Sequence, residues 1–241
     1  LFDSARGLGS AGYYKQLMSN LTDAELTSQT TGVTSFNSTG FTLGSGGTTG
    51  NASGDTYASW TFRKQPKFFD VVTYTGTGAV QNIAHNLGSV PGCMIVKRTD
   101  TLSNWQVYHT SLGNGQFIVL NSTGAVTGGA QGTTRWNSTT PTSTVFTVGT
   151  DATVNASGGT YVAYLFAHNA GGFGLTGTDN VISCGSFTTD GSGNATVNLG
   201  YEPQWVLIKR TDSNMNWYVI TQIVNIKHKL RIVLKQHCPK L

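Results

Sequence analysis

Apolar and polar residues alternate over many short stretches of this chain, in the two-residue period of β-strands. Strand patterns occur at 67–76 (KFFDVVTYTG), 93–99 (CMIVKRT), 115–120 (GQFIVL), 145–149 (VFTVG) and 160–169 (TYVAYLFAHN). Each is rich in β-branched and aromatic residues and is bounded by residues that favour turns. No segment has a convincing helical pattern apart from a weak turn at 22–26 (TDAEL). The pattern therefore predicts an all-β chain.

The stretch TYVAYLF, residues 160–166, is apolar on both alternations. A strand of this kind has two faces to bury, so we expect it at the centre of a sheet that is covered on each side. Short strands that bury a face pack most economically as two antiparallel layers. The predicted architecture is an antiparallel β-sandwich of the jelly-roll or lectin-like kind.

One block of sequence occurs twice: NLGSVPGCMIVKRTDTLSNW at 86–105 returns as NLGYEPQWVLIKRTDSNMNW at 198–217. Three further pairs match, namely 51–62 with 155–166, 40–44 with 145–149, and 2–7 with 108–113. Their offsets drift, and extra residues fall in Gly-rich loops such as 170–177 (AGGFGLTG). Such drift is typical of tandem repeats that take up insertions in loops, here with a unit of roughly 105–112 residues.

The repeat divides the chain into four parts. Residues 1–66 are the latter part of a first repeat, 67–170 a complete repeat, and 171–220 the opening part of a further repeat. Residues 221–241 form a basic tail in which the repeat pattern stops. The first and last copies are thus incomplete, and we expect some strands to be completed by a neighbouring copy.

Within the repeated block, the retained residues are those that a β-hairpin needs. Pro91 and Pro203 stand just before their strands, where a missing N–H costs no ladder hydrogen bond. Gly88 and Gly200 precede them in a turn that favours positive φ. The segments DTLSNW and DSNMNW form the hairpin turns, and a second strand begins at Trp105 or Trp217. Their Asp and Asn residues would also suit Ca²⁺, although turn chemistry accounts for them without a metal.

Composition and charge narrow the functional classes. Charged residues make up 11% of the chain, against roughly 25% in typical proteins, and Gly occurs 31 times. The net charge of +4 comes from the tail, because residues 1–220 hold ten basic residues against eleven acidic ones. The body therefore has no basic patch for nucleic acid. The tail has two explanations: a slip of the reading frame near Ile220, or a C-terminal extension of the protein. We favour the slip, because the repeat pattern stops inside a motif and not at the boundary of a unit.

Six residues form the candidate ligand-binding set: Lys97, Arg98, Arg135, Trp136, Lys209 and Arg210. The Lys-Arg pairs suit phosphate or acidic glycans, although such residues at a strand end also protect a sheet edge. Trp136, in the polar loop 132–141 (GTTRWNSTTP), is the best candidate to stack on a sugar ring. Trp105 and Trp217 recur in the hairpin and are better explained by packing.

Other chemistry has little support in the sequence. The cysteines Cys93, Cys184 and Cys238 show neither a paired framework nor metal-ligand spacing, and Cys93 suits a core position. No nucleophile motif is present, and the chain has only two glutamates for paired-carboxylate catalysis. There is no signal peptide or long apolar run. We expect no catalytic residues, metal or cofactor, and no membrane insertion.

The repeated letters resemble a known domain type. TGTGAVQNIAHNLGSVPGCMIVKRTDTLSNWQVYH, followed by FTVGTDATVNASGGTYVAYLF, is similar to a repeat domain in virion structural proteins of tailed bacteriophages, notably phages of marine cyanobacteria. The resemblance covers nearly all of residues 1–220 and fails at 221–241. It implies a tail-fibre-like or other structural protein of the extracellular virion, with other copies of itself or other virion proteins as partners.

Sequence and resemblance together predict a non-enzymatic appendage repeat that spaces or presents a host-binding surface. Low charge and abundant Gly, Ser, Thr and Asn suit a protease-resistant spacer. Binding to host cell-surface glycan, where it occurs, would be weak at each site and would rely on multiple copies. Two alternatives stay open: a polysaccharide depolymerase built on a β-sandwich, and a secreted cellular adhesin.

Overall fold

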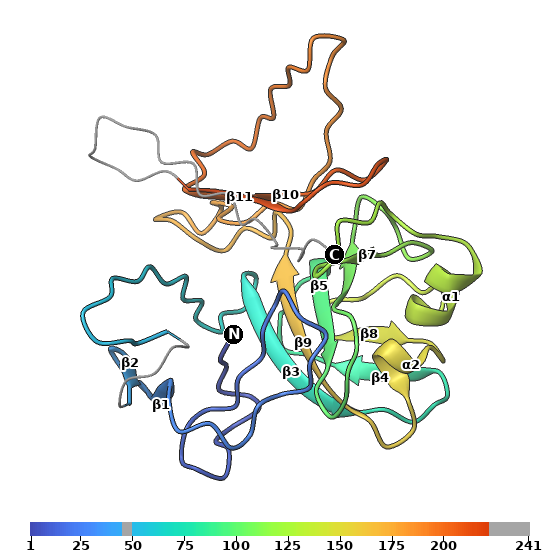
Figure 1. Ribbon diagram of the computed structural model, residues 1–241. Helices are drawn as coiled ribbons and strands as arrows, with labels where there is room; N and C mark the ends of the chain where they lie inside the picture. Colours follow the sequence, from blue (N-terminus) through green and yellow to red (C-terminus); the bar gives the residue numbers. More distant parts are fainter. Residues whose placement is uncertain (45–49, 222–241) are drawn as a thin grey trace.

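The computed structural model describes residues 1–44 and 50–221, and in these ranges the chain is mostly β, with antiparallel sheets and few helices (Figure 1). The elements, in chain order, are β1 (Val33–Asn37), β2 (Gly40–Leu43), β3 (Phe69–Thr75), β4 (Gln81–Ala84), β5 (Pro91–Arg98), β6 (Gln106–His109), β7 (Ile118–Val119), α1 (Ala130–Trp136), β8 (Val145–Val148), α2 (Ala152–Asn155), β9 (Thr160–Ala167), β10 (Trp205–Ile208) and β11 (Tyr218–Thr221). The predicted strands at 67–76, 93–99, 145–149 and 160–169 are all present.

The largest sheet has five antiparallel strands in the order β3-β9-β5-β6-β7. Strand β9 lies inside this sheet and pairs along its length with β3 on one side and β5 on the other. Three other antiparallel pairs accompany it in the described residues: β1 with β2, β4 with β8, and β10 with β11.

Strand β9 is buried on both faces, as its two apolar alternations predict. Tyr161, Ala163 and Leu165 face one hydrophobic cluster. Val162 and Tyr164, on the opposite face, belong to a second cluster. The strand therefore lies where two cores meet.

The β4–β8 pair and the two helices cover the first face of the large sheet, on the right of Figure 1. They contribute Ile83 from β4, Phe146 from β8, Trp136 from α1 and Val154 from α2 to the first cluster. Each of these side chains is at most 5% exposed. This layer comes from the same stretch of sequence as the sheet that it covers.

The N-terminal segment covers the opposite face, crossing the front of the sheet in Figure 1. Leu17 packs there in the cluster that contains Trp105 and Val162. Asp3 is also buried on this side, and its Oδ2 accepts hydrogen bonds from the Tyr164 hydroxyl and from Arg6 Nε, both at 2.7 Å. The second core thus depends on residues that lie far upstream of the sheet.

Both copies of the repeated block form antiparallel hairpins, as predicted. In the first, β5 pairs with β6, and in the second, β10 pairs with β11. Gly88 and Gly200 have the predicted positive φ, at 65° and 79°. The copies differ in their neighbours, because β5 also pairs with β9, whereas among the described residues β10 pairs with β11 alone.

The structure corrects several local predictions. Helices α1 and α2 occur where no helix was expected. Helix α2 is capped by Asp151, whose Oδ1 accepts from Thr153 N at 2.8 Å. Helix α1 is fixed by tertiary contact, since a Cβ at Gly132 would lie 1.9 Å from the Gly115 carbonyl oxygen.

Two other segments differ from expectation. The segment 22–26 is no turn of helix, and Leu26 instead bridges antiparallel to Gln16. Residues 51–62 form no strand, although their matching stretch 155–166 includes most of β9. Strand β9 is held in an extended form by its hydrogen bonds to β3 and β5, whereas residues 51–62 pair with no described strand. The predicted basic tail, apart from Thr221, lies outside the described residues.

Truncating a side chain of β9 tests how far the first core depends on this strand. Replacing Leu165, which is fully buried in the first cluster, by Ala is expected to lower the free energy of unfolding by about 2–5 kcal/mol, because a cavity remains. The control is Leu102→Ala in an exposed turn, expected to change it by less than about 0.5 kcal/mol. Urea denaturation measures both, and equal effects would contradict the assignment of Leu165 to the core.

Candidate functional site

Lys97 and Arg98 end β5 and are both engaged within the protein. Lys97 is 0% exposed, and its Nζ donates to the carbonyl oxygens of Thr22 at 3.1 Å and Arg98 at 2.6 Å. Burial lowers the pKa of this amine to about 8. Arg98 binds Asp100 through two hydrogen bonds of 2.8 and 2.9 Å, in the bidentate geometry that suits a guanidinium.

Lys209 and Arg210, at the end of β10, repeat this arrangement. Lys209 Nζ donates to the carbonyl oxygens of Thr123 at 3.0 Å and Met215 at 2.7 Å. Burial lowers the pKa of this amine as well. Arg210 pairs with Asp212 at 2.6 and 3.3 Å, and both side chains are exposed. In both copies the retained Lys therefore bonds a Thr carbonyl and the retained Arg bonds the retained Asp, whereas the second acceptor of the Lys amine differs.

The predicted role of Trp136 in sugar stacking is corrected by its position. The residue ends helix α1 instead of lying in an open loop, and it is 1% exposed. Its indole Nε1 donates to the Gln116 carbonyl at 3.0 Å, and its ring meets Tyr108 edge-on. Neither ring face is open to a sugar, because Trp136 packs inside the first hydrophobic cluster.

Arg135 is also bound internally. Its guanidinium lies over the Phe117 ring, 3.7 Å from the centroid. It donates to Gln106 Oε1 at 2.9 Å and pairs with Asp151 at 3.3 Å. A cation held by a ring, an amide and a carboxylate has little capacity left for a ligand.

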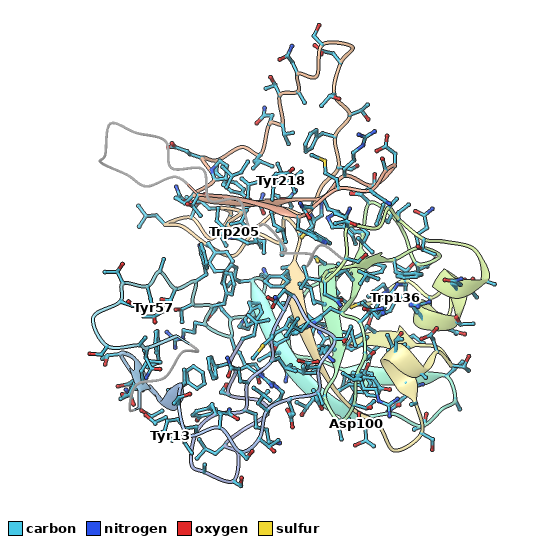
Figure 2. The ribbon with its side chains drawn as sticks, in the orientation of Figure 1. Tyr13, Tyr57, Asp100, Trp136, Trp205 and Tyr218 are labelled. Atoms are coloured by element: carbon cyan, nitrogen blue, oxygen red, sulfur yellow. The ribbon has the colours of Figure 1, made fainter. Side chains whose placement is uncertain are left out.

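The candidate residues do not converge on a single site. Arg98 and Arg135 approach adjacent residues at the start of α2, since Arg98 contacts the Ala152 carbonyl at 3.5 Å and Arg135 contacts Asp151. Figure 2 shows Trp136 on the right and Asp100 at the lower end of the sheet, away from the β10–β11 hairpin that carries the labels of Trp205 and Tyr218. Lys209 and Arg210 belong to that separate hairpin.

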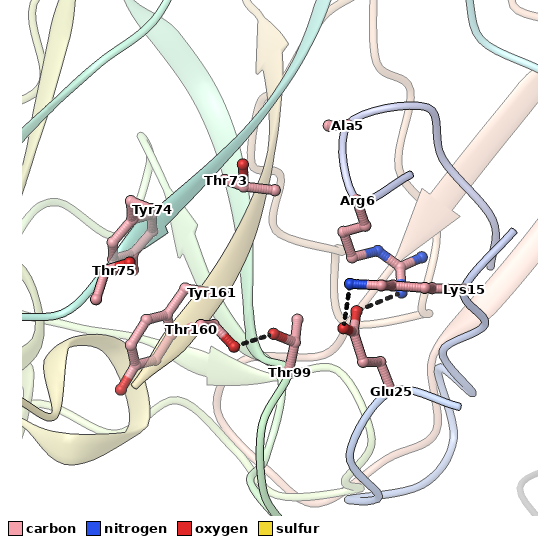
Figure 3. Close-up of a pocket in the computed structure, with 10 residues that line it drawn as sticks. All are labelled: Ala5, Arg6, Lys15, Glu25, Thr73, Tyr74, Thr75, Thr99, Thr160 and Tyr161. Carbon is pink, nitrogen blue, oxygen red and sulfur yellow. Dashed lines mark hydrogen bonds and ion pairs between the residues drawn. The ribbon is translucent and has the colours of Figure 1, made fainter. Parts of the chain in front are cut away.

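A pocket of about 380 Å³ opens between the N-terminal segment and one end of β3 and β9 (Figure 3). Glu25 sits there between two cations, with Oε2 3.4 Å from Arg6 and Oε1 3.0 Å from Lys15. The hydroxyls of Thr99 and Thr160 share a 2.7 Å hydrogen bond on another wall. None of the six candidate residues lines this pocket.

The lining of the pocket is mostly polar, with charged side chains and hydroxyl groups. Among the described residues, Glu25 is the only carboxylate in its lining, whereas glycoside cleavage uses two acids roughly 5–10 Å apart. The charge of Glu25 is also balanced by Arg6 and Lys15. The arrangement suits water or the hydroxyls of a polar ligand, and its ion pairs join residues of the N-terminal segment to one another.

Residues 1–44 and 50–221 hold neither a cluster of metal-ligating side chains nor a membrane-spanning helix. No group of three or more His, Cys, Asp or Glu side chains in these ranges is arranged to hold a metal ion. Asp100, considered for Ca²⁺, is instead bound to Arg98. Over the same ranges, no helix has the length and apolar character needed to cross a membrane.

Sequence reasoning missed Thr22 and Thr123, whose carbonyl oxygens accept from the two retained lysines, Lys97 and Lys209. A weak signal was present, because NLTDA at 20–24 and NSTGA at 121–125 share Asn, Thr and Ala. Five residues with two mismatches do not stand out in a chain rich in Asn and Thr. The side chains are also uninformative here, since the acceptor is the backbone.

The buried amine of Lys97 makes stability depend on pH. Its pKa is about 8 in the folded protein and 10.5 as a reference, so the unfolded chain holds the proton more tightly between these values. Stability is therefore expected to rise from about pH 8 to pH 10.5 by about 1–3 kcal/mol relative to Lys97→Met. Urea denaturation of both proteins across this range measures the difference. If the stability of the two proteins changed in parallel with pH, the lowered pKa of Lys97 would be contradicted.

Comparison with known proteins adds a family but no function. No match is found among curated proteins or among solved structures. One family model, described as Domain of unknown function (DUF7483), matches residues 1–232. This range includes all the described residues and continues into the basic tail, past the point where the sequence repeat stops. The chain belongs to the DUF7483 family.

Proposed function

We propose that this chain is a non-enzymatic structural part of a virion, in a tail fibre or similar appendage, where tandem β-sandwich repeats space or present a host-binding surface. The observation that carries the proposal is that the residues retained in both copies form bonds within the protein. In both copies the Lys amine binds backbone carbonyls and the Arg guanidinium binds the Asp two residues later. Residues kept for internal bonds point to a scaffold.

The layered packing supports the sandwich part of the proposal. One face of the five-stranded sheet is covered by the β4–β8 pair and the other by upstream residues. Each copy of the repeated block forms a hairpin with matching internal bonds. A chain that repeats both its letters and its local bonding fits tandem units.

The virion location rests on the resemblance of residues 1–220 to phage structural proteins. The composition agrees with it, since a chain with 11% charged residues and 31 glycines suits many short strands and tight turns. The expected partners are other copies or other virion proteins. The aromatic rings available for contact with host glycan are exposed ones such as those of Tyr57 and Trp60, which are 53% and 46% exposed. The buried ring of Trp136 is not available.

Antibody labelling of phage particles tests the location. Antibodies raised against the whole chain, with gold detection in electron microscopy, are expected to mark thin appendages of the particles. The control is pre-absorption of the antibody with the purified chain. Label confined to the surface of cells would overturn the proposal and favour the secreted adhesin.

A sugar-release assay tests the enzyme alternative. The purified chain, incubated with host surface polysaccharide, is expected to release no reducing ends above the buffer blank, because its described pocket has one carboxylate where two are needed. Release that disappears in the Glu25→Gln variant would favour the depolymerase and contradict the structural role.

A further inference from the structure

Two loops of the chain have the same backbone construction. Bridge loop 1, residues 16–26, is closed by hydrogen bonds that Gln16 and Leu26 exchange at 3.1 and 2.9 Å. Bridge loop 2, residues 117–127, is closed in the same way by Phe117 and Thr127 at 2.9 and 3.0 Å. Each loop docks on a hairpin that lies further along the chain, hairpin 1 (91–109) or hairpin 2 (205–221).

The carbonyl oxygen at the centre of each loop receives two donors from its hairpin. The oxygen of Thr22 accepts from Lys97 Nζ at 3.1 Å and from Ser103 N at 2.8 Å. The oxygen of Thr123 accepts from Lys209 Nζ at 3.0 Å and from Met215 N at 2.8 Å. The amine of a retained Lys thus bonds the same loop atom in both places.

Two more contacts repeat on either side of this one. Backbone hydrogen bonds of 2.9 Å run from Glu25 N to the Thr99 oxygen and from Val126 N to the Thr211 oxygen. Each retained tryptophan then reaches back to its loop. Trp105 Nε1 donates to the Met18 oxygen, and Trp217 Nε1 to the Val119 oxygen, both at 3.2 Å.

The two sets of contacts share a single register. Every loop atom of the second set lies 101 residues after its counterpart in the first, and every hairpin atom lies 112 residues after its counterpart. Four partner pairs agree in this way. Unrelated loop contacts have no reason to coincide four times, so the docking itself is repeated.

We propose that this contact is a head-to-tail joint through which the bridge loop of one repeat binds the hairpin of the next copy. The joint rests on the tandem organisation of the proposed function and names its partner, which is the following copy of the same unit. The loop offers backbone atoms, so its side chains can vary. The hairpin offers Lys and Trp side chains, which accounts for their retention.

The geometry of the joint implies a linear array. The complete unit uses hairpin 1 to bind bridge loop 1 from upstream, and its own bridge loop 2 binds hairpin 2 downstream. Such a contact joins two different surfaces, so it adds units in one direction and does not close on itself after a pair. At the first joint both Lys97 and Trp105 are 0% exposed, as in a rigid core.

Hydrogen–deuterium exchange of the full chain tests the joint one copy at a time. In Lys209→Met, the amides of Val126 and Met215 are expected to exchange at least about tenfold faster, while those of Glu25 and Ser103 keep their rates. In Lys97→Met, the amides of Glu25 and Ser103 are expected to exchange faster, while those of Val126 and Met215 keep their rates. The control is Arg210→Met, which removes an exposed ion pair inside hairpin 2 and should leave the Val126 amide unchanged.

Exchange protection of β9 separates opening of the joint from unfolding of the whole chain. The amides of Val162 and Leu165 in β9 should keep their exchange rates in Lys209→Met, whose site is less buried than that of Lys97. Unchanged exchange at Val126 and Met215 in Lys209→Met would overturn the joint, as would an equal effect of Arg210→Met. The result is independent of particle labelling. If antibodies label the appendages but the exchange experiment finds no joint, the repeats are linked flexibly and the proposed function still stands.

Discussion

A strand with two apolar faces has to be covered from both sides, and the rest of this structure follows from that requirement. The first face of β9 is covered by the β4–β8 pair and the helices, which come from the same stretch of chain. The second face is covered by Leu17 and its neighbours from upstream. Burial of β9 therefore links residues 1–26 to the sheet, and we infer that a repeat gains its second core from the copy before it.

Covering that second face brings polar groups into the interior, where they need partners. Asp3 receives the Tyr164 hydroxyl and Arg6, and the Lys97 amine and the Trp105 indole are received by backbone carbonyls of bridge loop 1. These hydrogen bonds fix the position of bridge loop 1 on the hairpin, because apolar contacts alone would allow the loop to shift along it. The retained polar residues thus determine the register between loop and hairpin, as the proposed spacer role would require.

Local signals predicted the elements whose character is local. The hairpins at 91–109 and 205–221 follow from Pro, Gly and turn residues at fixed places, and the position of β9 follows from its double alternation. Helix α1 was not foreseen, because its residues Gly, Thr and Arg carry no apolar period and Gly132 is placed by close packing on Gly115. Trp136 was misassigned for the same reason, since its polar neighbours gave no hint of a buried ring.

By itself the sequence determined the antiparallel hairpins, the doubly buried strand β9 and the repeated segments, because strand period and turn chemistry are read over a few residues. Only the tertiary structure decided which groups are free to act. It placed Lys97 and Lys209 on backbone carbonyls and Trp136 in the core, and it joined Thr22 to Lys97 and Thr123 to Lys209 across 75 and 86 residues. A backbone acceptor leaves no mark in the side-chain letters, so contacts of this kind become visible only when the chain is folded.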